Sequence, residues 1–318
     1  MPTEPPEFPR LDHRRARTVP LQARPSRVFR EALAGLPRPG SSFREFFGRL
    51  PRILAAEDLR AVVRAIRAAR AAGRPVVWGL GAHVIKVGLS PVIIGLMDAG
   101  YVDGLAMNGA GAIHDFELAL VGQTSEDVAE GLADGTFGMA EETGRFLNEC
   151  AVEAMATGTG WGEVVGRRIL ELNAPNADIS LLAQAYRRGI PATLHVTIGA
   201  DIIHMHPAAR GDALGAASFE DFLRFAGLVA RLEGGVYLNV GSAVVLPEVF
   251  LKALNLARNL GHRVENFTTV NLDMLRHYRP SENVLRRPTL QGGRGIHITG
   301  HHELMVPLLA QALIEDLE

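Results

Sequence analysis

The sequence predicts an α/β fold: a doubly wound, mostly parallel sheet with helices on both faces, preceded by an N-terminal extension. Two observations predict it. From residue 56 onward, short apolar runs alternate with amphipathic segments of roughly 10–15 residues, which is the pattern of βαβ units. The apolar runs are continuous and break into glycine-rich loops, as buried parallel strands do. Because no linker interrupts the alternation, we expect residues 1–55 to be a partly flexible extension and residues 56–318 to be a single Rossmann-like domain.

The expected elements follow one another in a regular order. The first long helix is amphipathic and ends at Gly73, and Ser90 with Pro91 in the first turn begins the next long helix. In chain order we expect a short helix between 42 and 54, a helix at 56–73, a strand within 75–83, a helix at 90–100, a strand, glycine loop and helix within 102–122, two helices within 139–172 parted near 158–160, a helix at 180–189, a strand at 190–199, a helix at 218–232, a strand at 236–241, a helix at 246–260, a strand at 265–271, a polar loop, a strand at 295–299 and a helix at 301–317.

Composition excludes several classes of protein. The 318 residues are 47% hydrophobic and 21% charged with a formal net charge of −2, which is typical of a globular chain and offers no electrostatic attraction to nucleic acid. The single cysteine, Cys150, excludes a disulfide framework, and its helical context suits a core residue. No apolar run is long enough to span a membrane, and the N-terminus lacks the apolar core of a secretory signal. We therefore expect a cytoplasmic protein without nucleic-acid or membrane partners.

The loops that follow the predicted strands carry the chemical signal. Ligands bind at the carboxyl ends of the strands in open α/β sheets. Glycine lets a backbone approach a ligand closely, and helix N-termini offer N–H groups to phosphates. Seven of the eleven histidines lie at these strand ends, namely His83, His114, His204, His206, His297, His301 and His302. This clustering predicts a binding or catalytic site.

The residues of these loops bear on three kinds of chemistry. Gly109 and Gly111 give the start of a dinucleotide fingerprint, but His114 replaces its third glycine. Asp201, His204 and His206 lie within six residues and have donor atoms that suit zinc, iron or manganese, although hydrogen-bonding or acid–base histidines are the alternative. No G-x-S-x-G elbow occurs, which argues against a serine hydrolase.

The segments around these loops resemble the deoxyhypusine synthase family over roughly residues 75–315. The resemblance implies that family's fold, an NAD site in which Asp201 matches a cofactor-binding aspartate, and a homotetramer with sites at subunit interfaces. The family's catalytic lysine falls at Leu246, and leucine cannot form an enzyme–imine intermediate. The resemblance is carried by IKVGLSPVIIGLMDAGYVDGLAMNGAGAIHDFE, GIPATLHVTIGADIIHMHP, VYLNVGSAVVLPEVFLKALNLA and GIHITGHHELMVPLLAQAL.

A shorter segment, residues 108–117, resembles the Asn-Ala…His-Asp-Ile-Glu segment of archaeal-type ornithine cyclodeaminases. That family uses NAD to oxidise an amino acid's amine to an imine, and this chemistry needs no enzyme lysine. It does need a base near the amine. The resemblance implies that His114 is this base and that Asp115 orients it.

The first hypothesis is therefore an NAD-dependent enzyme that oxidises a small amine or amino acid to an imine. His114 and Asp115 are its expected acid–base centre, and His204 and His206 line the substrate pocket together with His301 and Glu303. The expected cofactor-binding residues are Gly79, Gly81, His83, Asn108, Gly109, Gly111, Asp201, Asn239, Gly241, Ser242, His301 and His302.

Two alternatives stay open. The chain may be read as a non-catalytic NAD-binding or sensing protein that kept the fold without the lysine. It may also be read as a metal-dependent hydrolase or lyase that uses Asp201, His204 and His206.

Overall fold

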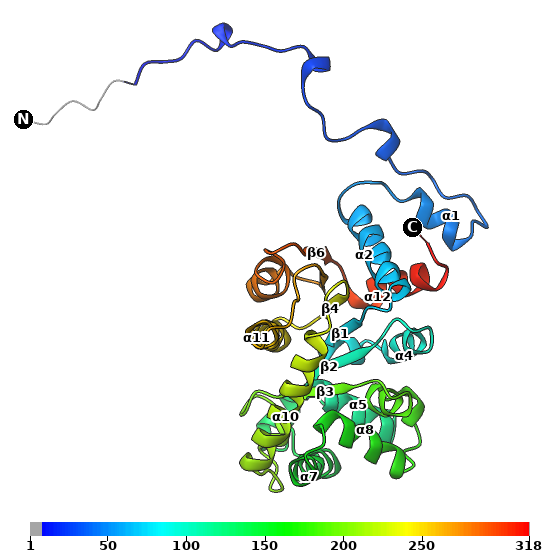
Figure 1. The fold of residues 1–318 in the computed structure, drawn as a ribbon, viewed down its shortest axis with the longest axis vertical. Helices are drawn as coiled ribbons and strands as arrows, with labels where there is room; N and C mark the ends of the chain where they lie inside the picture. The colour runs from blue at the N-terminus through cyan, green and yellow to red at the C-terminus, as the bar shows by residue number, and fades with distance from the viewer. Residues whose placement is uncertain (1–7, 318) are drawn as a thin grey trace, which may run out of the picture.

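A single sheet of six parallel strands forms the centre of the computed structural model, which describes residues 8–317 (Figure 1). The strands lie side by side in the order β3-β2-β1-β4-β5-β6. Their bounds are β1 Val76–Leu80, β2 Gly104–Asn108, β3 Ala192–His195, β4 Val236–Val240, β5 Thr268–Asp273 and β6 Arg294–Thr299. The order reverses between β1 and β4, so the gap beyond their carboxyl ends is the switch point where sheets of this kind bind ligands.

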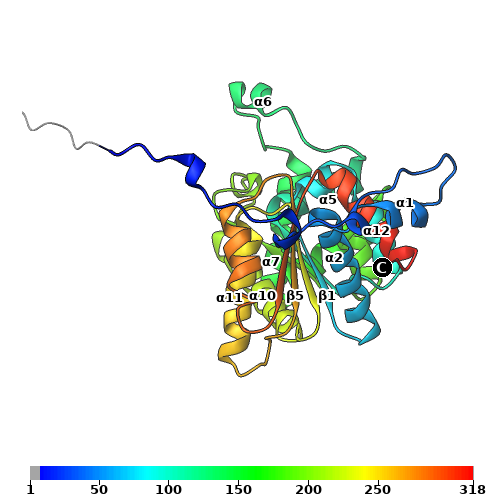
Figure 2. The same ribbon diagram turned by 90° about the horizontal axis from the view of Figure 1, so that it is seen from above.

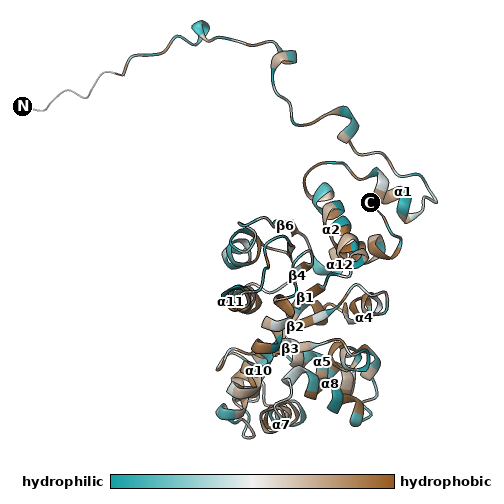
Figure 3. Cartoon of the chain, in the orientation of Figure 1, coloured by the Kyte–Doolittle hydropathy of each residue, from teal (hydrophilic) through white to brown (hydrophobic). Residues whose placement is uncertain are grey.

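Both faces of the sheet are buried, as the continuous apolar runs predict. Along β4, Val236, Leu238 and Val240 belong to a core cluster on one face, which includes α2, α4 and α12. Tyr237, between them in sequence, points to the other face and stacks on Phe250 of α11. Figure 3 shows the strands as a largely hydrophobic centre between the helical layers. The predicted doubly wound α/β fold is confirmed.

Twelve α-helices connect or flank these strands within the described residues. They are α1 Phe43–Arg49, α2 Leu54–Ala71, α3 His83–Lys86, α4 Ser90–Asp98, α5 Gly109–Val121, α6 Val128–Asp134, α7 Glu141–Thr157, α8 Trp161–Glu171, α9 Leu181–Arg187, α10 Gly211–Val229, α11 Val245–Asn259 and α12 His302–Ile314. Short 3₁₀ turns occur at His13–Arg15, Leu21–Ala23, Arg30–Ala32, Ala177–Ile179 and Ile202–His204, and a π-helical turn occurs at Pro280–Arg286.

Local signals explain where several helices begin and end. Ser42 and Glu45 form a reciprocal capping box at the start of α1. Gly158 adopts a left-handed conformation (φ 65°) that ends α7, and α8 begins at Trp161 after the predicted break. Gly122 ends α5 in the same way (φ 71°) and turns the chain out of that helix.

The structure differs from the predicted elements in several places. α10 begins at Gly211 rather than at residue 218, because Ala213 and Leu214 already face the core although glycines surround them in sequence. β3 ends at His195, because it is an edge strand and its one neighbour, β2, ends opposite it at Asn108 and passes into α5. α6 and the π-helical turn were not predicted, because both are short and have no clear apolar period.

The N-terminal segment runs away from the rest of the chain (Figure 1). From residue 8 to α1 it forms only short turns, and large apolar side chains such as Phe8, Leu11 and Leu36 are exposed. α1 itself contacts α2, where the Arg60 guanidinium donates to the Phe47 carbonyl. The division at residue 55 remains a prediction. In the described part of the chain, no helix combines the length and apolarity that a membrane span needs.

Candidate active site

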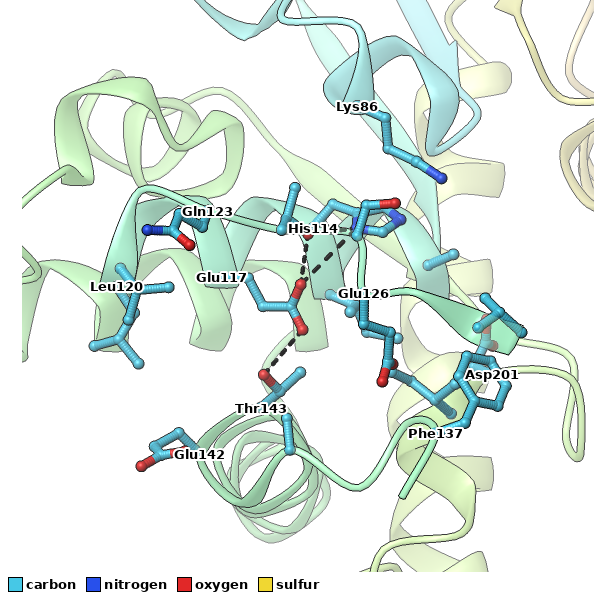
Figure 4. A pocket seen from close by; sticks show the side chains of 18 of the residues that line it. Lys86, His114, Glu117, Leu120, Gln123, Glu126, Phe137, Glu142, Thr143 and Asp201 are labelled. Carbon is cyan, nitrogen blue, oxygen red and sulfur yellow. Dashed lines mark hydrogen bonds and ion pairs between the residues drawn. The ribbon is translucent and has the colours of Figure 1, made fainter. Parts of the chain in front are cut away.

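A cavity of about 670 Å³ opens beside α5, near the carboxyl ends of β2 and β3 (Figure 4). Its walls come from α3, α5, α7, the segment 122–140 that carries α6, and the loop after β3. The polar and charged lining residues are Lys86, His114, Glu117, Gln123, Thr124, Ser125, Glu126, Glu142, Thr143 and Asp201. Its volume is within the range that small-molecule sites occupy, roughly 300–1,000 Å³.

The Asp201 carboxylate packs against the loop before α5 at Gly109. A Cβ atom added at Gly109 would lie 2.4 Å from Asp201 Oδ2, so glycine is needed here to admit that side chain. Asp201 also accepts a hydrogen bond from the Ala110 backbone, and Asn108 Oδ1 accepts from Gly111 N at 3.0 Å. Burial raises the pKa of the Asp201 carboxyl. The N–H groups that were expected to hold cofactor phosphates are therefore already used by Asn108 and Asp201.

His114 projects from the second turn of α5 into the cavity wall, where two other side chains hold it. Its Nδ1 lies 2.6 Å from Thr124 Oγ1, and Thr124 donates its hydroxyl proton to Glu117 Oε2. Thr143 of α7 donates to Glu117 Oε1 at 3.1 Å. Burial, and then the charge of Lys86, lower the pKa of His114 to about 4, so the imidazole is neutral at physiological pH.

Asp115 does not orient His114, contrary to the prediction. Adjacent helical residues point about 100° apart, and Asp115 faces the core instead of the cavity. Its carboxylate accepts from Ser180 Oγ at 2.6 Å, Leu181 N at 2.6 Å and Leu182 N at 3.1 Å, which fixes the start of α9 against α5. Burial raises its pKa to about 6 although these hydrogen bonds favour the charged form. Asp115 is thus a structural residue.

The switch point brings several predicted cofactor residues together. A Cβ atom added at Gly81 would lie 2.1 Å from the Gly241 carbonyl oxygen, so the loops after β1 and β4 touch backbone to backbone. The rings of His83 and His302 meet edge to face, with centroids 5.8 Å apart. His302 Nε2 donates to the Leu272 carbonyl, while its buried Nδ1 has no partner within residues 8–317.

A row of polar side chains crosses the neighbouring strands in register. Asn239 of β4 donates to Asn271 Oδ1 of β5 at 2.7 Å and also to the Ser242 carbonyl at 2.9 Å. Asn271 in turn meets His297 Nδ1 of β6 at 3.1 Å. The other amide oxygen, Asn239 Oδ1, is buried and without a partner in the described chain. Gly79 lies in the same row on β1, where the Tyr237 hydroxyl occupies the space that a Cβ atom would need.

His204 and His206 lie outside the cavity, contrary to their predicted role. His206 Nε2 donates to Glu141 at 3.2 Å and its Nδ1 accepts from Ala208 N, so both nitrogens serve to hold the loop against α7. His204 Nδ1 accepts from Gly199 N within its own turn. No group of three His, Cys, Asp or Glu side chains within residues 8–317 is placed to hold a metal ion. The Asp201, His204 and His206 set is therefore not assembled.

The remaining predicted residues are apart from the cavity as well. His301 is exposed beside Glu303, with Nδ1 and Oε1 3.7 Å apart, and neither lines the cavity. Leu246 is fully buried among the apolar side chains between the sheet and α11, so its side chain faces the core rather than the switch point.

Sequence reasoning missed most of the polar residues of the cavity, among them Lys86, Glu117 and Thr124. Glu117 could have been found, because it follows His114 by three residues and so shares its helical face. Lys86 lies in a single helical turn after β1 and belongs to no recognisable motif. Thr124 gave no signal, since its position depends on how the chain folds back after Gly122.

Replacing Lys86 by glutamine is expected to raise the pKa of His114 above its value of about 4, because it removes a cation that opposes protonation while burial remains. An NMR titration of the His114 ring would measure this. Lys252 supplies the matched control, since it pairs with Glu248 on α11, far along the chain from the cavity. If His114 had the same pKa in the Lys86→Gln protein as in the wild type, burial alone would account for its lowered pKa.

Comparisons with known proteins give structural neighbours only. Neither a family model nor a curated protein matches the sequence. The ternary complex of AgrE with ornithine and NAD⁺ aligns with a TM-score of 0.51 and 19% identity, over 84% of this chain and 34% of that one. The apo structure of ArgZ, an arginine dihydrolase from the ornithine–ammonia cycle in cyanobacteria, gives 0.50 and 16% over 83% and 33%. A putative deoxyhypusine synthase from Entamoeba histolytica gives 0.49 and 10% over 87% and 94%.

These likenesses concern the fold. The chain spans about a third of the length of AgrE and ArgZ, and its α/β architecture matches that part of both. The α/β fold that the sequence predicts is thereby confirmed.

Proposed function

We propose that this chain binds NAD and oxidises the amine of a small amine or amino acid to an imine, without a covalent lysine intermediate. The observation that carries the proposal is His114, a neutral imidazole that lines a cavity near the carboxyl ends of β2 and β3. A structural neighbour, AgrE, is described in complex with NAD⁺ and ornithine, which supports a cofactor and substrate of these classes.

The residues at the switch point fit a dinucleotide. The unpartnered Nδ1 of His302 and Oδ1 of Asn239 are buried acceptors that need a donor such as a ribose hydroxyl or a carboxamide. Together with Gly81 and Gly241 they would hold the cofactor, which would supply the hydride acceptor when bound. Asp201 contributes by closing the start of α5, which leaves the switch point as the place for the phosphates.

The cavity offers opposite charges to an amino acid. Lys86 is a cation on the α3 side, and Glu126, Glu142 and Asp201 lie on other walls. A substrate carboxylate would be drawn to Lys86 and a substrate ammonium to the acidic side chains. His114 would then accept the proton that the nitrogen loses before the carbon–hydrogen bond is broken.

Calorimetric titration of NAD⁺ into cofactor-free protein tests the first half of the proposal, and we expect a dissociation constant on the order of micromolar. The second half is tested by screening basic amino acids and diamines for NADH formation with the loaded protein. Absence of binding at millimolar NAD⁺ would overturn the redox reaction and leave the cavity to another ligand.

A non-catalytic NAD sensor remains the second candidate. It is distinguished by cofactor binding without NADH formation from any amine or amino acid in the screen. The structure does not support a metal-dependent hydrolase, because the expected ligands do not come together in the described residues. The cytoplasmic location and the homotetramer remain predictions, and the exposed apolar side chains before α1 are consistent with contacts between subunits.

A further inference from the structure

The segment 122–140 covers the cavity from outside. It leaves α5 at the left-handed Gly122, carries α6 and returns at Glu141 to α7, and Figure 2 shows α6 projecting from the body of the protein. None of the residues of α6 is buried. Near its start, however, the segment touches α5 through the polar side chain of Thr124, which hydrogen-bonds to both His114 and Glu117.

The direction of these hydrogen bonds follows from the number of protons available. An ionised carboxylate only accepts, so Thr124 must use its single hydroxyl proton toward Glu117 Oε2. Its oxygen can then only accept at the short contact with His114 Nδ1, so Nδ1 carries a proton. In a neutral imidazole the other nitrogen, Nε2, is left with a free lone pair. No hydrogen bond to Nε2 occurs within residues 8–317, and the ring borders the cavity.

We infer that Thr124 is a positioning residue: it holds His114 in the Nδ1–H tautomer and thereby makes Nε2 the proton acceptor of the cavity. Because Thr124 belongs to the segment 122–140, the base is correctly set only while that segment lies against α5. The catalytic consequence rests on the proposed function, whereas the tautomer does not depend on it.

In the proposed step, His114 takes up a proton from the substrate nitrogen. A substrate N–H proton passes to Nε2, the electron pair of that bond stays on the substrate nitrogen, and the ring becomes an imidazolium with protons on both nitrogens. Glu117 Oε2, 3.9 Å from Nδ1, stabilises the new positive charge. Thr143 holds the second carboxylate oxygen, so Glu117 remains in place during the transfer.

Other charged groups also face the ring. Lys86 of α3 opposes its protonation, while Glu126 of the covering segment, Glu142 of α7 and Asp201 after β3 line the same cavity. Of these charges, that of Lys86 lowers the pKa of the ring. None of them chooses between its nitrogens, because none hydrogen-bonds to Nδ1. The choice of tautomer is therefore specific to Thr124.

The test compares Thr124→Val, which removes the hydroxyl at nearly constant size, with Thr124→Ser, which keeps it. In the resting protein without cofactor, nitrogen-15 NMR of the His114 ring is expected to show the proton on Nδ1 in the wild type and in Thr124→Ser. Thr124→Val is expected to move much of the population to Nε2–H. The His114 signal is identified by its loss in His114→Gln, and Thr136→Val, on an exposed part of the same segment, is the control.

The kinetic readout is separate. With NAD⁺ and a substrate amine, Thr124→Val is expected to lower kcat about 10²-fold with little change in KM, and Thr124→Ser to restore it. A proton on Nε2 in the wild type, or the same tautomer in wild type and Thr124→Val, would overturn the inference. A wild-type protein with the expected tautomer but no turnover would instead refute the proposed function alone.

Discussion

Replacing His114 by glutamine is expected to lower the turnover number by about 10²- to 10⁴-fold while the affinity for NAD⁺ changes little. Glutamine retains a polar side chain but cannot take up the substrate proton, because its amide is not basic. The cofactor residues lie at the switch point rather than around this ring, so binding should survive. Steady-state kinetics at saturating NAD⁺ together with a calorimetric NAD⁺ titration would measure both quantities.

His262 provides the control for this substitution. It is exposed and lies before β5, near the amino ends of the strands, whereas the cavity lies near their carboxyl ends. His262→Gln should leave turnover and affinity unchanged. If His114→Gln kept more than about a tenth of the wild-type turnover, another group would have to be the base. If it abolished NAD⁺ binding as well, the ring would belong to the cofactor site.

The fold could be predicted because its causes are local. Continuous apolar runs are buried on both faces of the sheet, and glycines such as Gly122 and Gly158 end the helices that precede them. Errors appeared where tertiary contacts decided the outcome. β3 is cut short at His195, because its neighbour β2 ends at Asn108 and passes into α5.

The sequence predicts the site only in part, because residues that are neighbours in sequence need not be neighbours in space. Asp115 follows His114 directly but lies on another side of α5, where it fixes α9. Asp201 and His206 are five residues apart, yet one reaches the start of α5 and the other pairs with Glu141. In this chain His204 and His206 hold their own loop, whereas His114 lines the cavity.

The residues that complete the site come from segments that no short pattern links. Lys86 belongs to a single helical turn after β1, and Thr124 reaches His114 only because the chain reverses after Gly122. The positions of Lys86 and Thr124 depend on how separate elements pack together. No short sequence pattern predicts such packing. The spacing of His114 and Glu117 was the one visible sign of the cluster.

Replacing Gly81 by alanine is expected to destabilise the protein by about 1–3 kcal/mol or more and to weaken NAD⁺ binding. The added Cβ would lie 2.1 Å from the Gly241 carbonyl oxygen and 2.6 Å from its carbon. Gly81 N also donates to the Val240 carbonyl at 2.8 Å, so the two loops cannot separate without losing a hydrogen bond. Chemical denaturation and calorimetric titration would measure the two effects.

Gly95 of α4 is the matched control, because a Cβ there meets nothing within 4 Å and alanine in a helix should stabilise it by up to about 1 kcal/mol. Gly79 gives a sharper comparison, since its Cβ would meet the hydroxyl of Tyr237 rather than backbone. Tyr237→Phe should therefore rescue Gly79→Ala, whereas no side-chain substitution can rescue Gly81→Ala. If Gly81→Ala bound NAD⁺ normally, the backbone contact between β1 and β4 would be dispensable, and the cofactor would have to bind elsewhere than at the switch point.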